Sequence, residues 1–166
     1  MNTNGVLSFG QPHTSTSSGG SNFDSVSSPP IIAPFWDDIN VNVSGTIYYS
    51  QDSSPTIAEL FRQEVLSQYA ISFGPSLVFV ATWDRVAQFG GSSSIVNTFQ
   101  VVVASDGART FVRFIYGDIQ WGGPSTLIGV TAGDGVNFIM HPASLSSSVL
   151  LIANTSEIYR VDGELP

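Results

Sequence analysis

Short apolar runs alternate with polar turn residues along most of the chain, a pattern typical of β-strands. The runs predict strands near residues 5–9, 31–37, 45–51, 76–86, 96–105, 108–119, 126–132, 136–140, 148–153 and 157–161. Between the first two lies a polar loop at 10–30, rich in Ser, Gly and Pro. Loops of this length are often functional or mobile. The pattern predicts a mainly β domain.

One segment, residues 55–69, has the spacing of a helix. Ser54 is a candidate N-cap, Pro55 takes the first helical position, and good helix formers follow. The apolar stripe of this helix consists of Ile57, Leu60, Phe61, Val65 and Tyr69. Because only one side is apolar, we expect an amphipathic helix packed on a sheet. The fold class is therefore a layered, antiparallel, β-sandwich-like α+β domain.

The strongest hairpin signal is Asp106-Gly107 between two apolar runs. A two-residue turn there pairs Ser105 with Ala108, and counting outward gives one apolar face made of Val103 with Thr110, Val101 with Val112 and Phe99 with Phe114. The opposite face pairs Gln100 with Arg113, Val102 with Phe111 and Ala104 with Arg109. We take Gln100, Val102, Arg109, Phe111 and Arg113 as a candidate interaction face. The alternative is that the helix at 55–69 covers this face.

Two further runs carry predictions about burial. Residues 76–83 are apolar without alternation, which is typical of a strand buried on both sides. Residues 31–36 should place Ile32, Pro34 and Trp36 on one face and Ile31, Ala33 and Phe35 on the other.

Composition narrows the function classes. The chain has 166 residues, 42% of them apolar and 11% charged, and its net charge is -8. Its cations are all arginines, too few for a nucleic-acid groove and unfavourable for anionic membranes. It has no cysteine, no run long enough to span a membrane and no visible signal peptide. A single domain of this size can bury a substantial core.

The acidic pair Asp37-Asp38 after the aromatic run is the main candidate for chemistry. Asp37, Asp38 and Asn40 are candidate calcium ligands, although their spacing does not match an EF-hand. Neighbouring carboxylates on a strand point to opposite faces, which disfavours a facing catalytic pair. We favour a structural corner, where the strand leaves the core, and keep calcium as the chemical alternative.

Two enzymatic hypotheses remain as alternatives. A carbohydrate-active or carbohydrate-binding domain would use Trp36 or Trp83 with Asp37 or Asp84. A hydrolytic triad would need His141 as its base, but no G-x-S-x-G motif accompanies it. Two sequons make Asn42 and Asn154 candidate glycosylation sites in predicted loops.

Seven phrases resemble, in order, one known family. They are NGVLSFG (4–10), IIAPFWDDI (31–39), GTIYYSQ (45–51), ATWDRVAQFGG (81–91), NTFQVVVASDG (97–107), FIYGDIQW (114–121) and GVTAGDG (129–135). Together they are similar to the NIDO (nidogen-like) domain, an extracellular module found in nidogen, alpha-tectorin and certain membrane mucins and sushi-domain proteins. The FGGSSS stretch before NTFQ is most similar to the alpha-tectorin type.

The resemblance implies a non-catalytic module of cell–matrix adhesion or matrix assembly. Its partners would be extracellular or matrix proteins, including homotypic ones, with no nucleic acid and no direct membrane insertion by this domain. No cofactor and no catalytic residues are carried over. We expect residues 1–166 to form a single domain that lacks the family's first strand and was cut from a longer multidomain extracellular protein. The alternatives are the carbohydrate reading and a calcium-dependent adhesion module.

Overall fold

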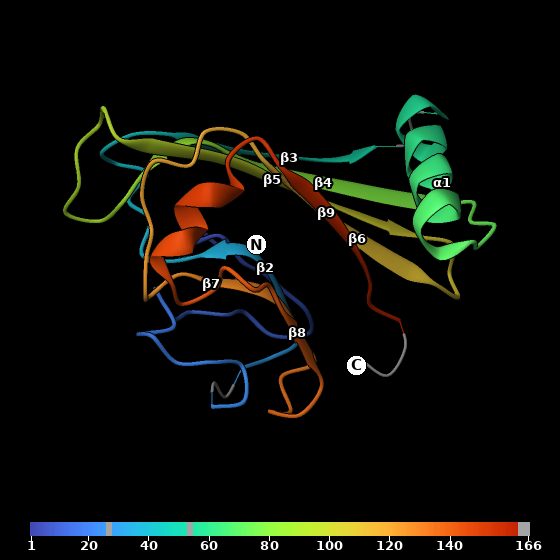
Figure 1. Cartoon of the computed structure of the whole chain (residues 1–166), viewed down its shortest axis with the longest axis horizontal. Coiled ribbons are helices and arrows are strands. Elements are labelled where there is room, and N and C mark those ends of the chain that lie inside the picture. The colour runs from blue at the N-terminus through green and yellow to red at the C-terminus, as the bar shows by residue number, and fades with distance from the viewer. Residues whose placement is uncertain (26–27, 53–54, 163–166) are drawn as a thin grey trace.

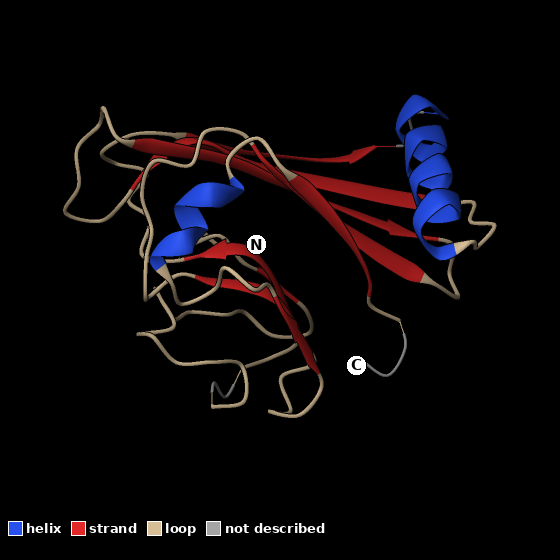
Figure 2. Cartoon of the chain, in the orientation of Figure 1, coloured by secondary structure: helices blue, strands red, loops and turns tan. Residues whose placement is uncertain are grey.

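The structure, a computed structural model, describes residues 1–25, 28–52 and 55–162 of the chain. Two antiparallel sheets pack face to face, and one α-helix lies across one end of the larger sheet, on its outer face (Figures 1 and 2). The predicted mainly β, sandwich-like fold with a helix packed on a sheet is confirmed. Ser54, the predicted N-cap, lies outside the described residues.

The strands fall close to their predicted positions. The four-stranded sheet has the order β1-β2-β7-β8, with β1 at Leu7–Ser8, β2 at Ile31–Trp36, β7 at Leu127–Thr131 and β8 at Phe138–Met140. The five-stranded sheet has the order β3-β4-β5-β6-β9, with β3 at Thr46–Asp52, β4 at Leu77–Ala87, β5 at Val96–Ser105, β6 at Thr110–Tyr116 and β9 at Ser156–Arg160. Helix α1 spans Pro55–Tyr69, as predicted, and a 3-10 helix, η1, spans Ser147–Ile152.

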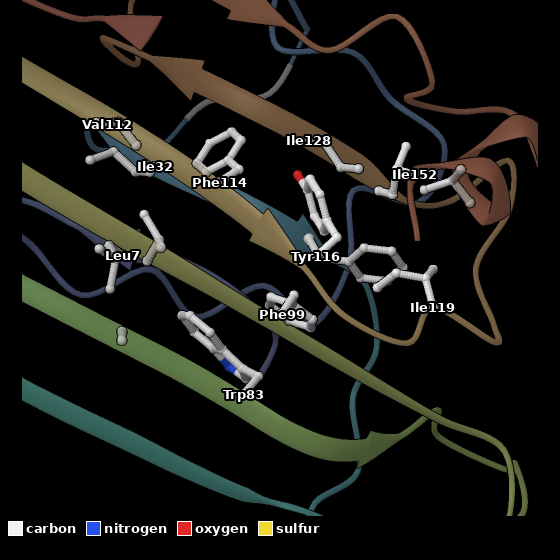
Figure 3. Close-up of a cluster of buried hydrophobic side chains, with 14 of the residues drawn as sticks. Leu7, Ile32, Trp83, Phe99, Val112, Phe114, Tyr116, Ile119, Ile128 and Ile152 are labelled. Carbon is white, nitrogen blue, oxygen red and sulfur yellow. The ribbon is translucent and has the colours of Figure 1, made fainter. Parts of the chain in front are cut away.

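Three apolar clusters hold these layers together. The largest lies between the two sheets and contains Trp83, Phe99 and Phe114 (Figure 3). The second lies between α1 and the outer face of the five-stranded sheet, where Phe61 and Val65 of the helix are buried. The third lies on the outer face of the four-stranded sheet. Burial of apolar area in all three layers is the main source of stability.

The third cluster is covered by residues of the polar loop that precede position 26. Phe23 from this loop is fully buried, and the His13 ring contacts Trp36 edge to face at 4.6 Å between centroids. The Ser18 hydroxyl donates to the carbonyl of Ser125 at 3.0 Å. Residues of a loop that the sequence marks as polar therefore complete the core.

A β-bulge in β2 makes the predicted faces of this strand wrong. Ala33 pairs with Gly129 and Trp36 with Leu127, so β2 has one more residue than β7 between these pairs. Trp36 therefore joins the outer cluster with Ala33, while Phe35 enters the core between the sheets. The extra residue falls at Pro34, which cannot donate to the ladder. Its carbonyl instead accepts from the Tyr116 hydroxyl at 2.9 Å, and burial raises the pKa of Tyr116 well above its ordinary value.

The predicted hairpin register is also wrong, by two residues. Ser105 pairs with Thr110, Val102 with Arg113 and Ala104 with Phe111. The Asp106 carboxylate accepts from the backbone N–H of Arg109 at 2.7 Å and that of Ala108 at 3.1 Å, and the Asp106 N–H donates to the Arg109 carbonyl. The turn therefore extends over 106–109. Because a shift of two preserves the alternation, each residue stays on its predicted face.

The predicted strand at 148–153 is instead the 3-10 helix η1. The Ser146 side chain caps it by accepting from the backbone N–H of Ser148 at 3.2 Å. Val149 and Ile152 are three residues apart, so they lie on one side of such a helix, and both are buried in the core between the sheets.

The apolar stripe of α1 is narrower than predicted. Phe61 and Val65 are buried and Ile57 and Tyr69 partly buried, but Leu60 is 57% exposed. Neither α1 nor η1, the helices in the described part of the chain, is long and apolar enough to cross a membrane.

Candidate functional site

The acidic corner after β2 is a hydrogen-bonded junction. Asp37 is only 2% exposed, and its carboxylate accepts from the Thr126 hydroxyl at 2.6 Å and from the Ser125 hydroxyl at 3.1 and 3.2 Å. The backbone N–H of Asp38 donates to the same carboxylate at 2.8 Å. These bonds join the end of β2 to the segment that leads into β7, because a buried carboxylate requires donors around it.

The other two calcium candidates lie in the turn that follows. The carbonyl of Asp38 accepts from the N–H of Phe89, and the side-chain oxygen of Asn40 accepts from the N–H of Asn42 at 3.1 Å. Asn40 thus forms the Asx turn that its residue type favours. Across residues 1–25, 28–52 and 55–162, no three His, Cys, Asp or Glu side chains gather in a group that could hold a metal ion.

The two tryptophans that the carbohydrate hypothesis requires, Trp36 and Trp83, lie in the interior. Trp36 is 1% exposed and Trp83 is fully buried, stacked on Phe99 at 5.1 Å between ring centroids. Asp84 accepts from the Thr98 hydroxyl at 3.4 Å. A ring that binds sugar must present its face to solvent, so neither tryptophan provides the stacking platform that the carbohydrate hypothesis requires.

His141 is engaged at both ring nitrogens. Its Nδ1 accepts from the backbone N–H of Ala143 at 2.9 Å, so Nε2 carries the proton and donates to Glu157 at 3.1 Å. Glu157 also accepts from the Tyr159 hydroxyl, and burial together with this bond raises the pKa of Tyr159. His141 therefore ties the segment after β8 to β9 and has no open nitrogen to act as a base.

The candidate interaction face lies on the outer side of the five-stranded sheet, partly beneath α1. Val102 is 5% exposed and Phe111 is fully buried, where it contacts the rings of Tyr69 and Phe73. These two residues belong to the core under the helix. At Val102 and Phe111, therefore, the alternative holds: the helix covers the face.

The polar members of the face have defined partners. Arg109 pairs with Asp106 at 2.6 Å in the hairpin turn, and its guanidinium lies 5.8 Å from the Phe73 ring centroid. Arg113 pairs with Glu64 of α1 at 3.1 Å. Gln100 donates to the Thr82 hydroxyl at 2.7 Å. Gln100 and Arg113 thus lie beside the helix rather than under it.

A groove of about 460 Å³ lies beside α1 on this face. It is lined by Ser50, Ile57, Leu60, Phe61, Val80, Thr82, Gln100, Val102, Arg113 and Ile115. Apolar walls with a few polar groups are typical of binding sites, and this volume lies within their usual range. The groove is therefore a candidate binding site on the outer face.

Sequence reasoning missed several groove residues. Val80 and Thr82 were expected inside a strand buried on both sides, yet both line the groove. Glu64 of α1, which does not line the groove but pairs with Arg113, which does, was not singled out either. The alternation Val78, Val80, Thr82 on β4 could have pointed to this face. The pairing of Glu64 with Arg113 had no such signal.

Both sequons are accessible. Asn42 and Asn154 are exposed, in the loop before β3 and just before β9, and Asn154 adopts a positive φ of 60°. Each site offers the surface position that a glycan needs.

Comparison with known proteins identifies relatives over the whole chain. The profile of the nidogen-like domain (NIDO) matches residues 1–164. Alpha-tectorin of Mus musculus is 30% identical over 188 residues, covering 99% of this chain and 9% of that protein. Nidogen of Drosophila melanogaster is 32% identical over 178 residues, which cover 98% of this chain and 12% of that protein. Nidogen-1 of Mus musculus is 33% identical over 124 residues, which cover 70% of this chain and 10% of that protein.

The chain therefore spans about a tenth of the length of these relatives. No solved structure gives a significant match. The resemblance drawn from the seven ordered phrases is confirmed.

Proposed function

The chain belongs to the nidogen-like domain family, and from this premise we propose that it is a non-catalytic interaction module of an extracellular matrix protein. Its role would be matrix assembly or cell–matrix adhesion, with extracellular or matrix proteins as partners. The observation that carries the proposal is the groove beside α1, a mixed apolar and polar hollow on the outer face of the five-stranded sheet.

The groove has the composition expected of a contact site for a protein. Leu60 lines it and is 57% exposed, and Thr82 and Gln100, which also line it, are joined by a hydrogen bond. Exposed apolar side chains next to partly buried polar groups allow a partner side chain to insert and be oriented.

Arg113 is held in place at the side of the groove. It bonds to Glu64 at 3.1 Å and to the Ser156 hydroxyl at 3.0 Å, so its conformation is fixed before a partner arrives. Arginine in a preorganised position is a common centre of interface energy because little side-chain entropy remains to be lost.

Extracellular placement is supported by the two exposed sequons and by family membership. Expression through a secretory pathway should give a protein whose mass falls on enzymatic deglycosylation. Asn42→Gln and Asn154→Gln should each remove one glycan. A protein that carries no glycan at either position would contradict this part of the proposal.

A pair of variants on one helix tests the groove. Leu60 and Leu66 of α1 are similarly exposed, at 57% and 51%, but only Leu60 lines the groove. Leu60→Asp should weaken retention of the domain on an extracellular matrix preparation at least about tenfold, which corresponds to 1.4 kcal/mol, whereas Leu66→Asp should leave it unchanged. Equal retention of both variants would contradict the assignment of the groove.

The charge at the groove can be tested separately. Arg113→Glu alone should weaken both folding and binding, since it places two acids together at Glu64. The double variant Arg113→Glu with Glu64→Arg restores an ion pair, so it should fold normally and bind differently from wild type. Unaltered binding by the folded double variant would show that the partner does not read this charge.

A further inference from the structure

The five-stranded sheet has two edge strands, β3 and β9 (Figure 1). β3 pairs with β4 along its whole length without a shift in register. Apart from this pairing, no backbone hydrogen bond joins Thr46–Asp52 to another segment among the described residues. Only alternate residues of an antiparallel strand bond to a given neighbour, so β3 presents outward N–H and C=O groups along an open edge.

The two edges differ in the features that prevent strand addition. Proteins protect edges with charges, prolines, bulges or short length. β9 is five residues long and carries Glu157 and Arg160. β3 is seven residues long, and Thr46 to Gln51 contain no charge and no proline. In a chain with net charge -8, this is an unusually neutral, regular edge.

Two tyrosines on this edge strand are exposed to solvent. Tyr48 is 57% exposed and Tyr49 is 70% exposed. The Tyr49 ring stacks on Phe79 of β4 at 6.4 Å between centroids, with 27° between the ring planes. A ring supported in this way loses little freedom when a second aromatic ring packs beside it.

We propose that β3 is a homotypic interface, at which two copies of this domain join edge to edge and antiparallel. The two-fold axis passes through Tyr49, so Tyr49 faces Tyr49 of the second copy and Tyr48 faces its Ser50. The two five-stranded sheets then form one continuous sheet. Main-chain hydrogen bonds supply affinity and the tyrosine pair fixes the register.

The charge distribution favours a second copy of the domain as the partner, paired antiparallel. An edge that meets a second copy of an acidic chain must itself be neutral, as β3 is from Thr46 to Gln51. Antiparallel pairing about Tyr49 places the two Asp52 residues six positions apart along the strands, about 20 Å, which exceeds the screening length of about 8 Å at physiological ionic strength. The interface shares Ser50 with the groove beside α1 but is centred on Tyr49, which does not line the groove, so substitutions at Tyr49 test it independently of the groove.

Single cysteines test the register directly, because the chain contains no cysteine of its own. Tyr49→Cys places two thiols opposite each other at the axis, within reach of a disulfide after a small adjustment. Tyr48→Cys offsets them along the strands, and Leu151→Cys, at an 80% exposed position on η1, is the remote control. Under mild oxidation, Tyr49→Cys should form linked dimers at least about tenfold faster than either control. Equal rates, or faster linking through position 48 or 151, would overturn the proposal.

Sedimentation velocity of the full chain provides the second measurement. Wild type should show a dimer whose fraction rises with concentration. Tyr49→Lys, which sets two cations opposite each other, should weaken the association at least about tenfold while circular dichroism shows an unchanged fold. Wild-type protein that stays monomeric at every concentration, or a folded Tyr49→Lys variant that dimerises like wild type, would overturn the proposal.

Discussion

The outer faces of the two sheets are covered in different ways. The four-stranded sheet is closed by irregular chain from the loop at 10–30, which places Phe23 in a sealed apolar cluster. The five-stranded sheet is covered by α1 across one end only, which leaves the groove beside Gln100 and Arg113. The polar loop completes the core, while the regular amphipathic helix leaves open surface beside it.

The difference shows that regularity of a covering segment does not measure how tightly it seals a sheet. A loop can follow the contour of the strands, whereas a straight helix meets a twisted sheet over a limited length. Function is therefore better sought beside the helix than in the loop. The following substitutions test this contrast, from the largest expected effect to the smallest.

Replacing the buried aromatic of the loop should cost the most. Phe23→Ala removes a fully buried ring from the cluster over the four-stranded sheet, so we expect a loss of about 3–5 kcal/mol in the free energy of unfolding, measured by urea denaturation. Phe9→Ala is the control, because Phe9 is 47% exposed. A cost below about 1 kcal/mol for Phe23→Ala would show that the loop does not seal this face.

The acidic corner should respond next. Asp37→Ala leaves the hydroxyls of Ser125 and Thr126 and one backbone N–H without their acceptor, so we expect a loss of about 3 kcal/mol. Asp38→Ala should cost less than about 0.5 kcal/mol, because Asp38 is partly exposed. Equal effects at the two positions would contradict the role of Asp37 as the junction of β2 and β7.

On the helix side, truncating the smaller side chain, Val65, should reduce stability more than truncating the larger one, Leu60. Val65→Ala should destabilise by about 2 kcal/mol, because Val65 is fully buried against the sheet. Leu60→Ala removes a larger side chain but should cost less than about 0.5 kcal/mol. Thermal unfolding of both variants measures the difference, and a larger effect at Leu60 would mean that the groove is closed in solution.

The loop side should also carry a dependence on pH. Burial lowers the pKa of His13 below its ordinary 6.5, so the unfolded chain binds the proton at higher pH than the folded chain. The stability contributed by the neutral, buried ring is complete above about pH 6.5 and declines as the pH falls through that value. His13→Phe should remove this part of the decline. An identical profile in the variant would contradict it.

Calcium should have the smallest effect. The oxygens of Asp37 and Asn40 already accept hydrogen bonds, so we expect the same melting temperature in chelator and in millimolar calcium. Any ligand that binds the folded state raises the melting temperature. A rise of several degrees in calcium that Asp37→Asn abolishes would establish a site at the corner.

Much of the fold could be predicted from local patterns. The helix at 55–69, the strands β2 to β9 and the alternation within the β5–β6 hairpin follow from residue type and period, which depend on short-range sterics. The family could also be identified from the sequence, because the seven phrases and their order are properties of the chain alone. Two residues of the candidate interaction face, Gln100 and Arg113, line the groove in the structure.

The misses have two causes. The bulge at Pro34 arises where β2 pairs with the distant strand β7, whereas the longer turn at 106–109 and the 3-10 helix at 147–152 are set by local side-chain bonds from Asp106 and Ser146 that the apolar pattern does not record. The burial of Phe23 and the exposure of Leu60 depend on which surface each meets.

The sequence by itself determined the class of this protein: a charge-poor, mainly β domain of the nidogen-like family, with one amphipathic helix. Composition, period and ordered phrases are properties of the chain alone. Only the tertiary structure decided that Asp37 of the acidic pair joins β2 to the segment before β7, that the loop seals one sheet, and that a groove and an open edge remain on the other. Those outcomes depend on packing between segments far apart in the chain, and no local pattern records it.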